Sequence, residues 1–256
     1  MARIHLTPDL GHPVMFEEVS LSTSRTRRRS GSGRRHQLRR LAGEASRQQI
    51  PLFEQLSVTV EEGEQVAIIG RKASDGGVEF LRLAAGTLIP DAGRVRRRDI
   101  VVPIIDNSNM LNANMTVRQN IYQAAAFLGV APDDVGPRLD WIVEFGGMAK
   151  RLDSYLKDAP KNLRQRIIWT VSFATEATCF AVENALVIGD EEFEAKCWDH
   201  VEHLKASGVT FLVVDDKHQR LERFCTRALL FDQGRLVADT TVGEALTRLR
   251  VTPTSD

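Results

Sequence analysis

Short apolar blocks follow one another along the chain, some with the pattern of a strand and others with the period of a helix. Between Leu52 and Gly70 the pattern predicts a strand over Leu56–Val60, a Glu-Glu-Gly turn, and an apolar strand over Gln65–Ile69 that ends at Gly70. From Val78 to Ala85 the apolar residues recur on one side of a helix. A strand, a glycine-containing loop and a helix, in that order, form the layout of a phosphate-binding loop.

Strands and helices continue to alternate through the rest of the chain. The expected strands are Val14–Leu21, Val101–Ile105, Cys179–Ile188, Thr210–Val214, Ala228–Asp232 and Arg235–Ala238. The expected helices are Thr116–Leu128 with Thr116 as N-cap, Pro137–Phe145, Asn162–Ala177, Glu191–Ala206 closed by Gly208, Leu221–Arg227 and Thr241–Leu249. This alternation predicts an α/β domain with a mainly parallel sheet.

The charge of the chain is balanced overall but unevenly placed. Lysine plus arginine and aspartate plus glutamate number 34 each, so the net charge does not argue for a nucleic-acid or membrane partner. Between Arg25 and Arg40, however, lie eight arginines and no acidic residue. We expect a mobile loop or a solvated helix here. Contact with an anionic lipid surface is the second interpretation, and nucleic acid is disfavoured because no aromatic residues are interleaved with the arginines.

Membrane-spanning and signal segments are both absent from the pattern. No apolar run reaches the roughly 18–20 residues needed to span a bilayer, and the first residues, MARIHLTPDLGHP, contain no apolar signal core. The cysteines Cys179, Cys197 and Cys225 are scattered and odd in number, which favours reduced thiols over a disulfide framework. We therefore expect a cytoplasmic protein.

Four strings of residues carry a family resemblance. They are LAAGTLIPDAG (Leu83–Gly93), MTVRQNIY (Met115–Tyr122), GDEEFEAKC (Gly189–Cys197) and RFCTRALLFDQGRLVAD (Arg223–Asp239). In this order and spacing they resemble ATP-binding-cassette (ABC) transporter ATPases. More narrowly, they are similar to the group that exports bacterial surface polysaccharides such as capsule, O-antigen and teichoic acid. The resemblance covers about residues 14 to 248.

The resemblance implies a fold, ligands and partners. The fold is a single ABC-type nucleotide-binding domain over residues 1–256, with a mainly parallel core sheet, an antiparallel β edge, a helical subdomain at about 112–175 and an arginine-rich insertion at about 22–47. The implied ligands are ATP and Mg²⁺. The implied partners are an integral-membrane permease at the inner face of the cell membrane and a second ABC subunit, either a copy of this chain or a competent ATPase.

The phosphate loop departs from the family pattern G-x-x-G-x-G-K-[ST]. The segment from Gly70 reads GRKASDGGVEF, and counting back from Gly86 places Gly77 at the lysine and Val78 at the hydroxyl residue, with one residue inserted. In the family the lysine meets the β- and γ-phosphates and the hydroxyl holds Mg²⁺, and glycine and valine can do neither. The remaining candidates for nucleotide contact are Gly70, Arg71, Lys72, Gly76, Gly77 and Val78.

The other chemical positions of the family are replaced as well. Glu183 and Asn184 stand where the family has the Asp-Glu pair that binds Mg²⁺ and polarises the attacking water. Glu183 keeps a carboxylate and is the candidate metal ligand, whereas Asn184 cannot accept a proton. Asp216 stands at the switch histidine, and the signature loop reads APKNL (Ala159–Leu163) where the family resembles YSSGM. Asn112 is the nearest substitute for the glutamine that the family offers to Mg²⁺.

Altered chemistry beside a retained framework favours a degenerate ATPase subunit of a surface-glycan exporter, with a structural or regulatory role. One alternative is an active ATPase with rerouted contacts, in which Lys72 replaces the loop lysine and Glu183 serves for both carboxylates. Another is a soluble module that binds an anionic partner through the arginine-rich segment. Structural roles also remain open. The glycine loop can be a strand-to-helix turn, and Glu183 can be a structural carboxylate at the end of a strand.

Overall fold

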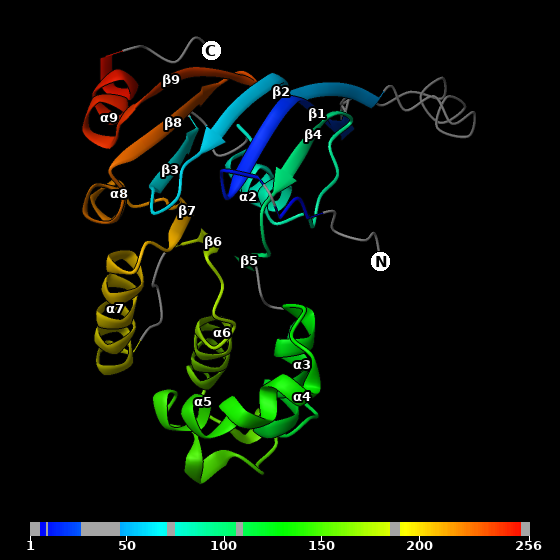
Figure 1. Ribbon diagram of the computed structural model, residues 1–256, viewed down its shortest axis with the longest axis vertical. Coiled ribbons are helices and arrows are strands. Elements are labelled where there is room, and N and C mark those ends of the chain that lie inside the picture. Colours follow the sequence, from blue (N-terminus) through cyan, green and yellow to red (C-terminus); the bar gives the residue numbers. More distant parts are fainter. Residues whose placement is uncertain are drawn as a thin grey trace, which may run out of the picture.

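The computed structural model describes residues 6–8, 10–26, 47–70, 75–105, 110–184 and 190–251, and the strands of this part form two sheets (Figure 1). The antiparallel sheet has the order β2 (Arg47–Val60), β1 (Val14–Thr26) and β4 (Ala92–Arg97). The mixed sheet has the order β5 (Val101–Ile104), β6 (Cys179–Glu183), β7 (Thr210–Val214), β3 (Gln65–Gly70), β8 (Arg227–Asp232) and β9 (Arg235–Thr241). All pairs in the mixed sheet are parallel except β8 with β9, so the predicted mainly parallel core with an antiparallel edge is confirmed.

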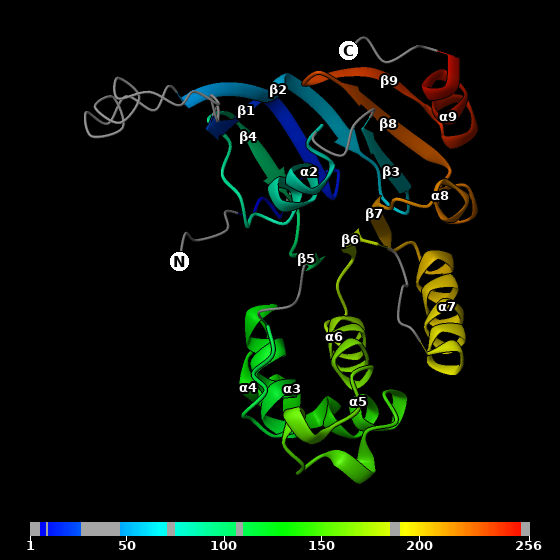
Figure 2. The same ribbon diagram turned by 180° about the vertical axis from the view of Figure 1, so that it is seen from behind.

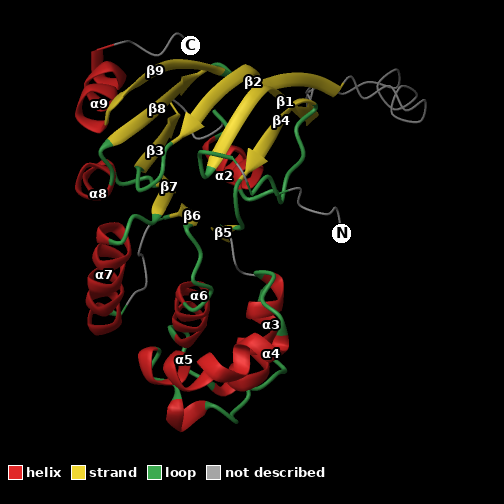
Figure 3. Cartoon of the chain, in the orientation of Figure 1, coloured by secondary structure: helices red, strands yellow, loops and turns green. Residues whose placement is uncertain are grey.

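The helices lie in two places (Figure 3). One group gathers at the end of the molecule away from the strands: α3 (Val117–Phe127), α4 (Pro132–Val135), α5 (Leu139–Phe145) and α6 (Leu163–Phe173), with 3-10 turns at Gly136–Arg138, Ala149–Arg151 and Leu156–Asp158. The others accompany the sheets: α2 (Gly77–Ala84), α7 (Glu191–Ala206), α8 (His218–Phe224) and α9 (Val242–Val251). No helix of the described ranges is both long and apolar enough to cross a bilayer.

The mixed sheet is buried on both faces. Along β3, Val66 and Ile68 belong to the core that the sheet shares with α2 and the antiparallel sheet, whereas Ala67 and Ile69 belong to the core beneath the other helices. Figure 2 shows α2 lying against the antiparallel sheet. Burial on both faces explains why β3 is an almost continuous apolar run in the sequence.

A cluster of phenylalanine rings joins α2 to both sheets. The ring of Phe80 on α2 is fully buried and stacks on Phe16 of β1, with 4.4 Å between the ring centroids. Phe53 of β2 and Phe231 of β8 meet the same ring at 6.3 and 5.9 Å. Because α2 follows the candidate phosphate loop, this cluster holds the start of that helix in place against the two sheets.

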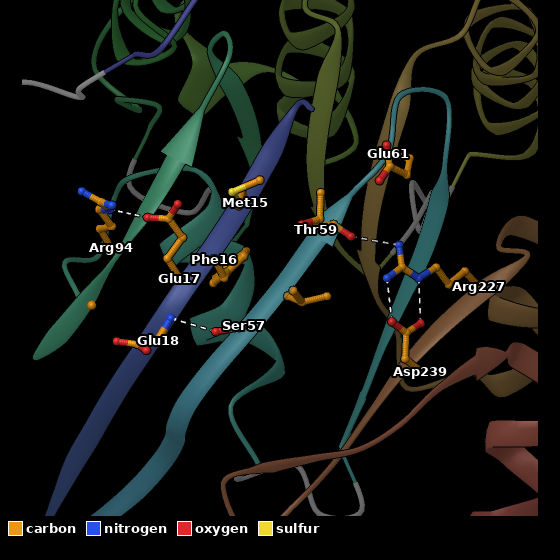
Figure 4. Close-up of a pocket in the computed structure, with 12 residues that line it drawn as sticks. Met15, Phe16, Glu17, Glu18, Ser57, Thr59, Glu61, Arg94, Arg227 and Asp239 are labelled. Atoms are coloured by element: carbon orange, nitrogen blue, oxygen red, sulfur yellow. Dashed lines mark hydrogen bonds and ion pairs between the residues drawn. The ribbon is translucent and has the colours of Figure 1, made fainter. Parts of the chain in front are cut away.

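Arg227 ties the two sheets together at their junction (Figure 4). Its guanidinium donates to both carboxylate oxygens of Asp239 on β9 at 2.7 Å each, to the carbonyl oxygen of Thr59 on β2 at 3.0 Å, and to Glu64 at 2.6 Å. These bonds, above all the pair to Asp239, raise the pKa of Arg227 above its ordinary value. Arg227, Asp239 and Thr59 line a hollow of about 940 Å³. Glu17, which pairs with Arg94, lines it as well (Figure 4).

Near the chain's arginines, one element prediction is wrong and one strand is missed. The sequence predicts a helix over Leu221–Arg227, but α8 ends at Phe224 and Arg227 opens β8, where it pairs with Thr241. Strand β4 is not predicted at all, because its arginines hide the alternation of an edge strand. Gly93 allows β4 to approach β1: its φ is +76°, and a Cβ there would lie 2.5 Å from the carbonyl oxygen of Glu17.

The arginine-rich segment begins later than the sequence predicts. A loop or solvated helix is expected from Ser24, yet β1 continues to Thr26 and pairs antiparallel with β2, which starts at Arg47. The register places Thr26 opposite Arg47, so the ends of the expected insertion at 22–47 are strand. Residues 27–46, which carry most of the run from Arg25 to Arg40, lie outside the described residues.

Candidate functional site

A pocket of about 900 Å³ opens at the carboxyl ends of β6 and β7, beside the start of α2. Such ends of parallel strands are where open α/β sheets bind ligands. Its described lining consists of Val78, Arg82, Ile104, Leu111, Arg164, Gln165, Ile168, Trp169, Glu183, Asn184, Asp216, Lys217 and Arg220.

The structure brings four of the predicted site residues into this lining. Val78 comes from the first turn of α2, Glu183 ends β6, Asn184 follows it, and Asp216 follows β7. Glu183 is half-buried, whereas Asn184 and Asp216 are exposed. Asn184 has a φ of +54°, a conformation that asparagine tolerates better than most residues, and its backbone N–H donates to Val214 at 2.8 Å.

The glycines of the candidate phosphate loop set the start of α2. Gly70 ends β3, Gly76 is the N-cap with a φ of +85°, and Gly77 is the first helical residue. A Cβ at Gly76 would lie 2.8 Å from Phe53, and one at Gly77 would lie 3.3 Å from Val214. The two glycines therefore let the helix begin close to its neighbours, and neither has a side chain to offer a phosphate. Arg71 and Lys72 lie outside the described residues.

The segment that the resemblance aligns with the signature loop, Ala159–Leu163, takes part in hydrogen bonds within the chain. The side-chain amide of Asn162 donates to Asp190 at 2.6 Å, and Arg166 donates to the same carboxylate and, at 3.0 Å, to the carbonyl oxygen of Gly146. Asp190 also caps α7 by accepting from the N–H of Phe193 at 3.2 Å. The bonds from Arg166, more than any other cause, hold the pKa of Asp190 below its ordinary value. Asn162 thus helps to hold α6 against α7.

Asn112, the nearest substitute for the family's glutamine, does not belong to the described pocket lining. Its side-chain oxygen accepts from the N–H of Asn114 at 2.9 Å, and its backbone bonds to the side chain of Asn120. Leu111, its neighbour, lines the pocket instead. In this turn the oxygen that the resemblance assigns to a metal accepts a local hydrogen bond.

Basic side chains in the pocket are the feature that sequence reasoning missed. Arg82, Arg164, Lys217 and Arg220 all belong to the lining. Arg220 pairs at 3.2 Å with Asp215, whose side chain is fully buried and also accepts from the N–H of Lys217 at 2.7 Å. Arg82 could have been found, because it lies four residues after Val78 and therefore on the same face of α2.

The described lining does not fit Mg²⁺-ATP as the family binds it. Valine at position 78 offers no oxygen to a metal, and asparagine at position 184 cannot act as a base. Glu183 and Asp216 are the acidic members of the described lining. Beside these two carboxylates the lining holds basic groups that suit an anion.

Comparison with known proteins places the chain in a family. No protein-family model matches it. It is 30% identical over 184 residues to the O-antigen export system ATP-binding protein RfbB of Klebsiella pneumoniae, a match that covers 72% of this chain and 74% of that protein. The chain belongs to the ABC transporter family. The relatives that it matches include ATP-binding proteins named for O-antigen export and for teichoic acids export.

Other ABC relatives are longer than the matched region. The chain is 29% identical to ABC transporter protein AbcA of Aeromonas salmonicida over 71% of its own length but only 59% of the relative. It is 26% identical to the teichoic acids export ATP-binding protein TagH of Bacillus anthracis over 71% of its length and 33% of that protein. The chain thus spans less than two thirds of each of these two relatives.

Solved ABC structures share the fold. An ATP-binding subunit of an ABC transporter superposes with a TM-score of 0.68 at 18% identity, covering 93% of this chain and 95% of that one. A dimeric ATP-binding cassette bound to ADP and phosphate superposes with a TM-score of 0.65 at 14% identity, covering 90% and 98%. At these identities the likeness concerns the fold of the ABC domain alone.

Proposed function

We propose that this chain is an ABC exporter subunit that does not hydrolyse ATP and has a structural or regulatory role in the export of a cell-surface polysaccharide or lipid-linked glycan. The observation that carries the proposal is the convergence of Val78, Asn184 and Asp216 on one pocket. Substitutions scattered over a surface would leave the chemistry intact. These three meet where the strands end and α2 begins, which is where a phosphate-binding domain does its chemistry.

The proposed loss follows from what phosphoryl transfer requires. Catalysis of this reaction rests on charge stabilisation by a metal and basic groups, and on a positioned nucleophile. The chain has valine where a hydroxyl would hold the metal and asparagine where a carboxylate would polarise water. Where several groups act as a unit in catalysis, removing a single one abolishes most of the rate enhancement. Several replacements together therefore support inactivity.

The proposed partners follow from the family. Relatives are named as ATP-binding proteins of export systems, and a solved cassette of the same fold is dimeric. We propose that this chain docks on an integral-membrane permease at the inner face of the cell membrane. There it pairs with a competent ABC ATPase or with a second copy of itself.

Purification of the tagged chain from membranes of its native host tests this assembly. A permease and an ABC ATPase with an intact phosphate loop are expected to co-purify with it. In the same cells, deletion of the chain is expected to stop glycan export, whereas Glu183→Gln leaves export unchanged because Glu183 has no catalytic role. A chain recovered without a permease, or an export defect in Glu183→Gln as severe as that of the deletion, would count against the proposal.

A further inference from the structure

The basic side chains of the pocket come from separate elements of the fold. Arg82 lies on α2, Arg164 on α6, Lys217 in the turn after β7, and Arg220 on α8. Arg82 and Arg164 are half-buried, and neither guanidinium has a hydrogen bond or ion pair within the described ranges. Two arginines that are partly withdrawn from water and line one cavity favour an anionic occupant.

Acidic groups offset only part of this charge. Asp215 neutralises Arg220 at 3.2 Å. The other acids of the described lining, Glu183 and Asp216, stand against three cations, namely Arg82, Arg164 and Lys217. The first turn of α2 also contributes Val78 to the lining, and the positive end of a helix dipole adds to the attraction for an anion.

We infer that this pocket binds a diphosphate-type anion through Arg82 and Arg164 without a divalent metal. The planar guanidinium matches phosphate oxygens through paired hydrogen bonds, and a dianion or larger can engage several cations at once. A metal has no role in this mode, since valine replaces the hydroxyl at position 78 and the cations meet the phosphate oxygens directly. The inference rests on the proposed function, because it assigns a ligand to the site that has lost its hydrolytic chemistry.

Thermal unfolding of the purified chain with pyrophosphate in EDTA tests the inference. Binding raises the midpoint with ligand concentration by mass action. The variant Arg82→Gln/Arg164→Gln is expected to weaken the apparent affinity by about tenfold for each arginine removed. Neither substitution breaks a bond among the described residues, so both variants should fold. The matched control is Lys150→Gln/Arg151→Gln, which removes two exposed positive charges from a 3-10 turn outside the pocket lining and should leave the affinity unchanged.

Each outcome of this titration decides the question. A shift in EDTA that the pocket variant loses and the control variant keeps supports the inference. Four results would overturn it. The midpoint stays flat up to millimolar pyrophosphate, or it shifts only when Mg²⁺ is present. Alternatively, sulfate at the same ionic strength gives an equal shift, or the two variants lose the shift equally. An ADP arm separates the sources: tighter binding than pyrophosphate indicates a nucleotide, and equal binding a free diphosphate. ATP hydrolysis by the chain would overturn the proposed function alone, and a flat titration the inference alone.

Discussion

Replacing Phe80 with alanine is expected to lower the free energy of unfolding by about 3–5 kcal/mol. The ring is fully buried and contacts Phe16, Phe53 and Phe231, which belong to both sheets. Alanine removes these contacts and leaves a cavity that rigid sheets on two sides cannot close. Urea denaturation followed by far-ultraviolet circular dichroism measures the change.

The matched control for this prediction is Phe127→Ala. Phe127 ends α3 and is 59% exposed, so its loss should change the unfolding free energy by less than about 0.5–1 kcal/mol. Equal losses in the two variants would contradict the role of the aromatic cluster. The expected difference matters for the site, because the Phe80 cluster holds α2, whose first turn lines the pocket, against both sheets.

The variant Arg166→Ala is expected to cost about 2–3 kcal/mol at neutral pH, since it removes charge-assisted bonds that join α6 to α7. The pair is largely buried, with side chains 19% and 14% exposed, so solvent screens it little. Arg166 holds the folded pKa of Asp190 below its ordinary value of 3.8. A carboxyl group with a lowered pKa stabilises the fold above its unfolded pKa, and this stabilisation is lost as the pH falls through the folded pKa.

The pH dependence gives this prediction its sharpest test. The difference in unfolding free energy between wild type and Arg166→Ala should be constant above about pH 5 and shrink as the pH falls below about 4. The control Arg118→Ala breaks the exposed, solvent-screened pair with Asp153 and should cost much less than Arg166→Ala at every pH. A cost for Arg166→Ala that does not change down to the acid limit would rule out Asp190 as the partner that matters.

Elements with strong local signals could be predicted from the sequence. The predicted bounds of the helix at Glu191–Ala206 agree with α7, because Asp190 caps its start and Gly208, with a φ of +83°, follows its end. Thr116 forms the predicted N-cap of α3 as part of a capping box with Gln119. Strand β4 could not be predicted, since its partner β1 lies far away in the sequence and its arginines mimic a loop.

For the site, too, local sequence signals could be predicted and contacts made by folding could not. Val78, Glu183, Asn184 and Asp216 could be named from motif positions, because each follows a strand or opens a helix whose pattern is clear. The bond between Asn162 and Asp190 could not, since it joins residues 28 positions apart through the packing of α6 on α7. The basic side of the pocket could not be predicted for the same reason, because Arg164 and Lys217 come to line one pocket only in the folded chain.

Steady-state ATP hydrolysis by the purified chain, in excess Mg²⁺, tests the central claim most directly: the scaffold of an ABC ATPase is kept and its chemistry is lost. The comparison includes Glu183→Gln and an intact ABC export ATPase prepared in the same way. We predict that the chain releases phosphate at the background rate and that Glu183→Gln changes nothing. Turnover close to that of the intact ATPase, abolished by Glu183→Gln, would contradict the claim.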